Sequence, residues 1–214
     1  MIRFDTLLLD LDDTLYSPSN GLWEQVRFLI GEYMIQSVGI PPENVDSTRQ
    51  HYLETYGTTL QGLIRHHAID PLDYLEYVHP VSLEAYIKPD PVLAAMLSSL
   101  PQRKIIFTNS YRKHAERVVD TLGIGKYIDS IVDILALDLD NKPQPIAYTK
   151  LLKLAEIKDP VKCLFADDRP ANLAPASELG ITTVLVSSES LNTGGDYHIQ
   201  HIHQLDQLIP GLRS

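Results

Sequence analysis

Five short apolar runs, each flanked by segments with helical periodicity, constrain the fold of this 214-residue chain more than any other feature. Runs of four to six residues match strand length and are too short for typical helices. We therefore expect strands at residues 6–9, 104–107, 131–135, 161–166 and 183–186.

The segments between the later runs carry helix-start and helix-stop signals. Helices are expected at residues 91–100, 111–122, 145–154 and 170–179. Pro91, Pro145 and Pro170 open three of them, where the missing N–H costs nothing, and Gly123 and Gly180 follow two of them as C-terminal caps. This alternation predicts an α/β fold with a doubly wound, Rossmann-like parallel sheet and right-handed crossovers.

The pattern changes between the first and second runs. Residues from about 21 to 86 show no strand signal, and helices are expected instead at 22–38, 45–56, 60–67 and 71–78. We therefore predict a core domain of residues 1–17 and 87–214 with a helical domain of residues 18–86 inserted after the first strand. Such an insert follows the carboxyl edge of the sheet, which carries the ligand site in open α/β folds. The polar tail after residue 187 contains one weak strand or helix around 197–208.

Acidic residues end the first apolar run, in the segment LLLDLDDTL at 7–15. If the chain stays extended, Asp10 and Asp12 share a face and Asp13 points away. Two neighbouring carboxylates repel each other, and a hard cation such as Mg²⁺ would resolve that conflict. A surface turn rich in Asp is an equally good explanation of this segment alone.

A second apolar run also ends in acids, in the segment FADDRPAN at 165–172. A cap for the helix opening at Pro170 accounts for one of these, Asp167 or Asp168. Capping does not account for two strands that both end in clustered acids at the same predicted sheet edge. A shared cation does.

Two further segments carry groups suited to phosphate. Thr108, Asn109 and Ser110 end a third run with hydroxyl and amide donors, although helix capping explains them equally well. Lys142 precedes Pro143, which favours an extended loop, and its ammonium could offset charge on a phosphoryl group. A lone lysine is more often a solvated side chain.

Together these motifs resemble those of the haloacid dehalogenase superfamily of phosphohydrolases, over about residues 6–186. The matching residues are Asp10, Asp12 and Thr14 for the first motif, Thr108 for the second, Lys142 for the third, and Asp167 and Asp168 for the fourth. A match of four motifs in the right order is specific, whereas any single one would be weak. The helical insert resembles the cap of the family's capped members.

The resemblance implies a Mg²⁺-dependent hydrolase that forms an aspartyl-phosphate on Asp10. Asp12 would protonate the leaving oxygen and later deprotonate the attacking water. Thr108 and Lys142 would bind phosphate oxygens. The implied metal ligands are Asp10, the backbone carbonyl of Asp12 and Asp168, with Asp167 in support.

Within the superfamily the chain is most similar to the pyrimidine 5′-nucleotidase-like branch, through the segments DDTLY at 12–16, YGTTLQGL at 56–63 and TNS at 108–110 with HAER at 114–117. This resemblance favours a nucleoside 5′-monophosphate as substrate, with a sugar phosphate or phosphoglycolate as the runner-up. Candidate substrate-binding residues are Tyr56, Thr59, Gly62 and Asn109. One departure is Asn172, where some members carry an acid, and we expect it to orient Asp167 or metal-bound water at a cost in metal affinity.

Three rival functions remain to be weighed. Dehalogenation has no use for Asp12 or an acidic metal site. A phosphomutase would need a phosphorylated acceptor. A catalytically inactive binding module usually lacks the nucleophile or a metal acid, and here all of them are present.

Composition limits which partners the protein can bind and indicates its cellular compartment. The net charge of −10 repels polyanions and so argues against nucleic-acid binding. The single cysteine, Cys163, cannot form an intrachain disulfide and reads as part of a buried strand. Asp10 interrupts the first apolar segment, so no signal peptide or membrane-spanning helix is expected there. We therefore expect a cytoplasmic protein with a small phosphomonoester as its substrate.

Overall fold

The computed structural model describes residues 4–189, 194–208 and 212, and the chain forms two compact units. Met1–Ser19 and Ile87–Ser214 form one of them, the α/β unit, and Asn20–Tyr86 form the other, the helical unit.

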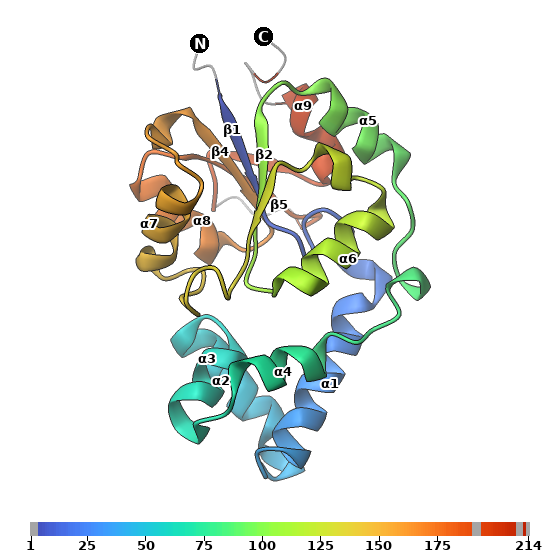
Figure 1. Ribbon diagram of the computed structural model, residues 1–214, viewed down its shortest axis with the longest axis vertical. Helices are drawn as coiled ribbons and strands as arrows, with labels where there is room; N and C mark the ends of the chain where they lie inside the picture. The colour runs from blue at the N-terminus through green and yellow to red at the C-terminus, as the bar shows by residue number, and fades with distance from the viewer. Residues whose placement is uncertain (1–3, 190–193, 209–211, 213–214) are drawn as a thin grey trace. The chain divides into compact units, whose positions relative to one another are not determined.

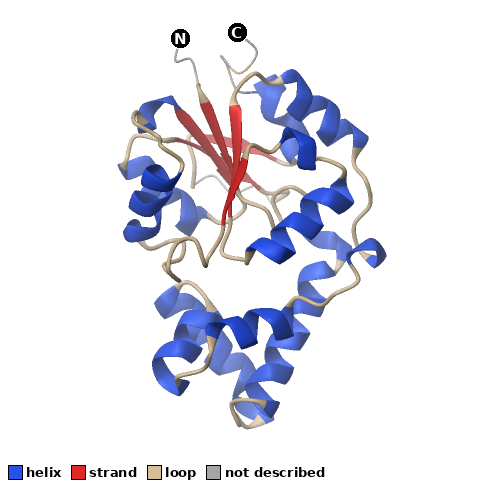
Figure 2. Ribbon diagram, in the orientation of Figure 1, coloured by secondary structure: helices blue, strands red, loops and turns tan. Residues whose placement is uncertain are grey.

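The α/β unit is built on a six-stranded sheet in which all neighbouring strands are parallel (Figures 1 and 2). The strands are β1 (Thr6–Leu9), β2 (Arg103–Phe107), β3 (Ser130–Val132), β4 (Cys163–Asp167), β5 (Thr182–Val186) and β6 (Tyr197–Ile199). Their order is β3-β2-β1-β4-β5-β6, so the direction of winding reverses at β1. The doubly wound parallel fold predicted from the sequence is confirmed.

Helices cover both faces of this sheet. Figure 1 shows α5 (Pro91–Ser99) and α6 (Arg112–Leu122) on one side, and α7 (Pro145–Leu154) and α8 (Pro170–Glu178) on the other. A short last helix, α9, spans Leu205–Leu208. The four longer helices agree with their predicted bounds to within one residue. With both faces covered, every residue of the central strand β1 is buried, and its last three residues are leucines.

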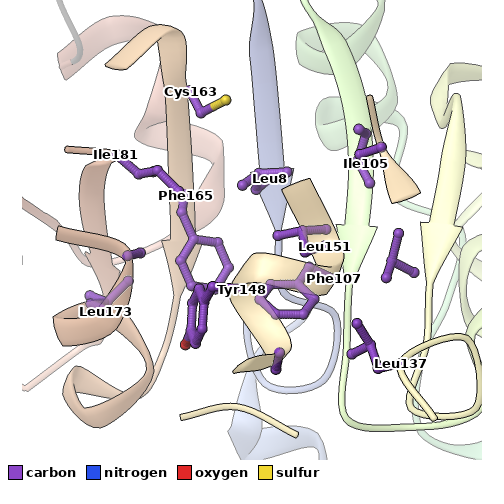
Figure 3. Packing of buried hydrophobic residues seen from close by; sticks show 14 of the residues in the cluster. Leu8, Ile105, Phe107, Leu137, Tyr148, Leu151, Cys163, Phe165, Leu173 and Ile181 are labelled. Atoms are coloured by element: carbon purple, nitrogen blue, oxygen red, sulfur yellow. The ribbon is translucent and has the colours of Figure 1, made fainter. Parts of the chain in front are cut away.

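Three aromatic side chains pack together in the core on the α7 and α8 side of the sheet (Figure 3). Tyr148 of α7 lies with its ring centroid 5.3 Å from Phe107 and 6.3 Å from Phe165, both at edge-to-face angles. Phe107 is the last residue of β2, and Phe165 lies in the middle of β4. Cys163 is buried in the same cluster, as the sequence predicted.

Two expected strands differ from the structure by more than one residue, and the tail adds a further strand. The strand expected at 131–135 ends at Val132, because Asp133 accepts hydrogen bonds from the backbone N–H groups of Arg112 and Ala136. The strand expected at 161–166 begins only at Cys163, because Pro160 opens a 3-10 turn. The ambiguous tail contains both predicted kinds of element, since β6 adds a sixth strand and α9 follows it.

The helical unit contains four helices at the predicted places. They are α1 (Leu22–Gln36), α2 (Val45–Tyr56), α3 (Thr59–His67) and α4 (Pro71–Val78). Tyr33 of α1 packs edge-on against Tyr74 and Tyr77 of α4 and donates to the Asp73 carboxylate. Within the described residues, no helix has both the length and the apolar character needed to cross a membrane.

Gly62 allows α3 to approach α2 closely. A Cβ at this position would lie 2.0 Å from Cγ of Tyr52, whose buried side chain also contacts His67 through its hydroxyl. We expect Gly62→Ala to destabilise the protein by about 1–3 kcal/mol, because neither helix can retreat without losing packing. Chemical denaturation of the variant would measure this loss.

Gly31 in α1 is the matched control. A Cβ there would lie 3.5 Å from Cγ1 of Val45, an ordinary contact, so Gly31→Ala should be neutral or add about 0.5–1 kcal/mol through helix propensity. Equal effects of the two substitutions would contradict the close-packing explanation.

Candidate active site

Carboxylates from two adjacent strands meet at the carboxyl edge of the sheet. The Asp10 N–H donates to the Ala166 carbonyl and so extends the ladder between β1 and β4, whose last residue is Asp167. Asp168 follows directly. One side-chain oxygen from each of Asp10, Asp167 and Asp168 lies within 4.8 Å of the other two. The structure thus brings together the acids of the first and fourth motifs.

Lys142 lies between two of these acids. Its Nζ donates to Oδ1 of Asp10 at 2.6 Å and to Oδ2 of Asp167 at 2.7 Å, and the side chain is only 1% exposed. The Nζ also lies 5.0 Å from the ring centroid of Phe107 and 5.3 Å from that of Phe165. Lys142 is therefore a buried counter-ion, and the solvated side chain weighed as an alternative is wrong.

The backbone of Lys142 is held from the end of β2. The Asn109 side chain accepts a hydrogen bond from the Lys142 N–H and donates another to the Lys142 carbonyl. Because both amide atoms are used in this way, Asn109 positions the lysine loop; its predicted contact with phosphate stays a prediction. Thr108 is buried, and its hydroxyl oxygen accepts from the Ser110 N–H at 3.0 Å.

Asp167 is fully buried and surrounded by donors. Asn172 donates from Nδ2 to both of its oxygens, at 2.9 and 3.0 Å, and the Arg169 N–H donates to Oδ1. The expectation that Asn172 orients Asp167 is therefore confirmed by the structure. Asp168 differs, because among the described residues none donates a hydrogen bond to its carboxylate. Of this pair, Asp168 has the freer oxygens for a metal.

The charges at this edge do not balance. Three carboxylates face one ammonium. Burial raises the pKa of Asp10, and Asp167 raises it further, although Lys142 opposes the shift. Burial also raises the pKa of Asp168, with Asp10 and Asp167 adding to the rise. Excess buried negative charge carried on oxygen ligands fits a divalent hard cation such as Mg²⁺.

Magnesium should therefore stabilise the folded protein. At a concentration about 100 times Kd, binding adds about 2.7 kcal/mol, which raises Tm by roughly 5–10 °C in a chain of this size. Asp168→Asn should remove most of this increase, measured by thermal unfolding with and without MgCl₂. Asp138→Asn, a change at an exposed carboxylate, should keep it. A full increase in Asp168→Asn would place the cation elsewhere.

Asp12 occupies a turn, not a strand. The chain leaves the extended conformation after Leu11, whose carbonyl accepts from the N–H groups of Thr14 and Leu15. The expectation that Asp12 shares a strand face with Asp10 therefore does not apply. Asp13 has a left-handed backbone with φ of 61°. Turn geometry, not strand alternation, sets the direction of both side chains.

Three donors surround the buried carboxylate of Asp12. Tyr16 and His114 contact Oδ1 at 2.7 and 2.9 Å, and Ser110 donates to Oδ2 at 2.5 Å. Burial alone would raise the pKa of Asp12, but His114, with the two hydroxyls, outweighs it and holds the pKa well below its usual range. Thr14 similarly donates to Oδ2 of Asp10, at 2.9 Å.

No role was predicted for Tyr16 or His114, although both lie in segments quoted for the branch resemblance, and Ser110 was expected to face phosphate. Ser110 lies two residues before α6 (Arg112–Leu122), so no helical spacing relates it to His114. Nothing in the sequence indicates that these three side chains meet Asp12.

The candidate substrate residues Tyr56, Thr59 and Gly62 belong to the helical unit. The Tyr56 hydroxyl lies 2.8 Å from Nε2 of His66, and Thr59 is buried in the first turn of α3. The close packing of α3 against α2 explains why a glycine stands at position 62. Substrate contacts at these three positions stay predictions.

Comparison with known proteins agrees with this geometry. The haloacid dehalogenase-like hydrolase family matches residues 4–180. Phosphate metabolism protein 8 of Saccharomyces cerevisiae is 26% identical over 190 residues, covering 82% of this chain. The chain spans 59% of the length of that relative.

Solved structures with low sequence identity share the fold. A HAD phosphatase from Thermococcus onnurineus superposes with a TM-score of 0.67 at 14% identity, over 99% of this chain and 100% of that one. L-2-haloacid dehalogenase from Xanthobacter autotrophicus gives 0.60 at 16%, over 98% and 99% of the two chains. Because the family match spans most of the sequence, this chain belongs to the haloacid dehalogenase-like hydrolases.

Proposed function

We propose that this protein is a Mg²⁺-dependent phosphomonoester hydrolase in which Asp10 is the nucleophile. The observation that carries the proposal is the convergence of Asp10, Asp167 and Asp168 within 4.8 Å, beside the buried ammonium of Lys142. The name of the yeast relative, a phosphate metabolism protein, supports phosphate chemistry over other reactions of the family.

The first half of the reaction transfers the phosphoryl group to the enzyme. The negative charge of a bound phosphate opposes the low pKa that Asp12 has in the free protein and favours the protonated carboxyl. A carboxylate oxygen of Asp10 then attacks phosphorus, the bond to the leaving oxygen breaks, and protonated Asp12 gives that oxygen its proton so that an alcohol departs. Thr14 and Lys142 fix the orientation of Asp10 through its two oxygens. Thr108 lies at the same edge of the sheet, at the end of β2, as a phosphate-binding candidate.

The second half restores the enzyme. Asp12, now ionised, takes a proton from water as the water attacks phosphorus, and the bond between phosphorus and Asp10 breaks to release inorganic phosphate. Asp10, Asp168 and the backbone carbonyl of Asp12 would hold the cation, and Asp167 would support them. When bound, Mg²⁺ offsets the negative charge that otherwise keeps a phosphate dianion away from a carboxylate.

Asp12 favours ester hydrolysis over dehalogenation. A halide leaves as a stable anion and needs no proton, whereas an alkoxide does. A buried carboxylate with three donors, next to the nucleophile, suits a reaction in which an alkoxide leaves and must be protonated. The fold shared with dehalogenases does not decide the reaction.

For the substrate we propose a nucleoside 5′-monophosphate, with pyrimidine bases preferred. The similarity to the pyrimidine 5′-nucleotidase-like branch supports this class, and a sugar phosphate or phosphoglycolate is the alternative. In this proposal Tyr56, Thr59 and Gly62 of the helical unit contribute to the choice of the leaving group.

A panel of phosphomonoesters tests the proposal. We expect phosphate release that requires Mg²⁺, stops with EDTA and resumes when MgCl₂ is added in excess. The highest kcat/KM should belong to pyrimidine 5′-monophosphates. If nucleotides are no better than sugar phosphates, the substrate assignment fails and the phosphatase assignment stands. Undiminished release in EDTA, or no release from any ester, would contradict the proposed function itself.

A further inference from the structure

The side chain of Asp12 is buried, and three other side chains contact its carboxylate. Tyr16, Ser110 and His114, which we call the Asp12 donors, contact it at 2.7, 2.5 and 2.9 Å. Asp12 and Tyr16 are each 8% exposed, Ser110 is 5% exposed and His114 is 1% exposed. A buried carboxylate held by three short contacts has little rotational freedom.

These donors come from two separate parts of the α/β unit. Tyr16 follows Asp12 by four residues in the turn after β1, whereas Ser110 and His114 lie 98 and 102 residues further along the chain. Ser110 follows β2, and His114 lies in the first turn of α6. The packing of α6 therefore determines where the Asp12 carboxylate lies.

Each oxygen of Asp12 is fixed by a different element. Oδ2 accepts a hydrogen bond from Ser110, and Oδ1 is shared by the phenol of Tyr16 and the imidazole of His114. Loss of one donor to Oδ1 would leave the carboxylate free to turn about its last bond. General acid catalysis is sensitive to such a change, because a displacement of about 1 Å costs on the order of 10²-fold in rate.

We propose that His114 and Tyr16 are positioning residues for the general acid–base catalyst Asp12. They hold its carboxylate where it can pass a proton to the leaving oxygen. This inference rests on the proposed function, because it assumes that Asp12 serves a phosphoester. Neither residue touches the substrate; both act through Asp12.

Substrates with different leaving groups can distinguish a positioning role from simple structural support. Alkyl phosphates need a proton on the departing oxygen, whereas 2,4-dinitrophenyl phosphate releases a stable anion. The ratio kcat/KM covers the steps up to departure of the leaving group. A misplaced Asp12 should therefore lower kcat/KM far more for the alkyl ester, while general damage to the site should lower both alike.

His114→Leu is the main variant, tested with the best alkyl phosphate of the panel and with 2,4-dinitrophenyl phosphate. We expect kcat/KM to fall by on the order of 10²-fold for the alkyl ester, through kcat and not KM, and by less than roughly tenfold for the aryl ester. His114→Gln, whose amide can donate from a similar place, should recover most of the loss. His203→Gln alters another histidine–aspartate contact, to Asp90 at 2.8 Å, and should leave both substrates unaffected.

Tyr16→Phe is the second variant, because it removes one oxygen and preserves the ring. It tests the positioning role if His114→Leu does not fold. Tyr33→Phe is its control, since the Tyr33 hydroxyl also donates to a carboxylate, that of Asp73 in the helical unit. The same selective loss for the alkyl ester supports the proposal.

Equal losses for the two esters, or full activity, in folded variants would overturn the positioning role. If Asp12→Asn shows the selective loss and His114→Leu does not, the inference fails while the proposed function stands. If the unmodified protein releases no phosphate in a Mg²⁺-dependent reaction, both fail together.

Discussion

Asp10→Asn should abolish phosphate release, with a loss in kcat on the order of 10³-fold or more, because the amide cannot form the covalent intermediate. The fold should survive. Burial disfavours the ionised form of Asp10, as its raised pKa indicates, and two further carboxylates remain for Lys142 and the cation. We therefore expect the variant to unfold at or above the unfolding temperature of the parent protein when Mg²⁺ is absent.

Asp138→Asn is the control for this change. Its carboxylate is exposed and pairs with Lys150 away from the site, so kcat and KM should match those of the unmodified protein. More than a tenth of the parental activity in purified Asp10→Asn would show that another group attacks phosphorus. Unfolding of the variant would show instead that Asp10 serves the fold.

Lys142→Met should lower both stability and activity, because it removes the ammonium that pairs with two buried carboxylates. Removing one partner of a buried ion pair typically costs about 3–5 kcal/mol. The charges of Asp10 and Asp167 would then repel without compensation, and MgCl₂ should restore part of the lost stability. Phosphate release should fall by on the order of 10²-fold or more through kcat.

Lys150→Met provides the comparison at a partly exposed position, where the side chain is 27% exposed. Lys150 also contacts two carboxylates, those of Asp138 and Asp140, at 2.9 and 2.7 Å. Water already solvates the Lys150 ammonium, so removing this charge should change the midpoint of urea unfolding little. Similar shifts of the two midpoints would contradict the view that burial makes the Lys142 contacts important.

Local signals predicted most of the fold. Proline at the first helical position and glycine after the last one fixed the helix limits, and apolar runs located the central strands. The exceptions have physical causes that the apolar pattern does not show. β3 stops at Val132 because the Asp133 carboxylate accepts from the backbone N–H of Arg112, 21 residues earlier in the chain, and from that of Ala136 in the turn that follows. β6 is only three residues long, too short for a clear pattern.

The candidate site, like the fold, could be predicted from the sequence only in part. Strand ends followed by Asp10, Asp167 and Asp168 predicted a meeting of carboxylates, because parallel strands share a carboxyl edge. The partners within the site were not predictable, since they depend on helix phase and turn geometry. The two-atom contact of Asn109 with Lys142 and the contact of His114 with Asp12 each join segments 33 or 102 residues apart.

A covalent trap measures the central claim most directly. Protein quenched in acid during turnover of labelled substrate would be treated with borohydride, which reduces an acyl phosphate, and then digested and sequenced by mass spectrometry. We predict that label enters the protein only with Mg²⁺ present and that Asp10 is the residue converted to homoserine. Modification of a different residue, or turnover that never labels the protein, would contradict the account.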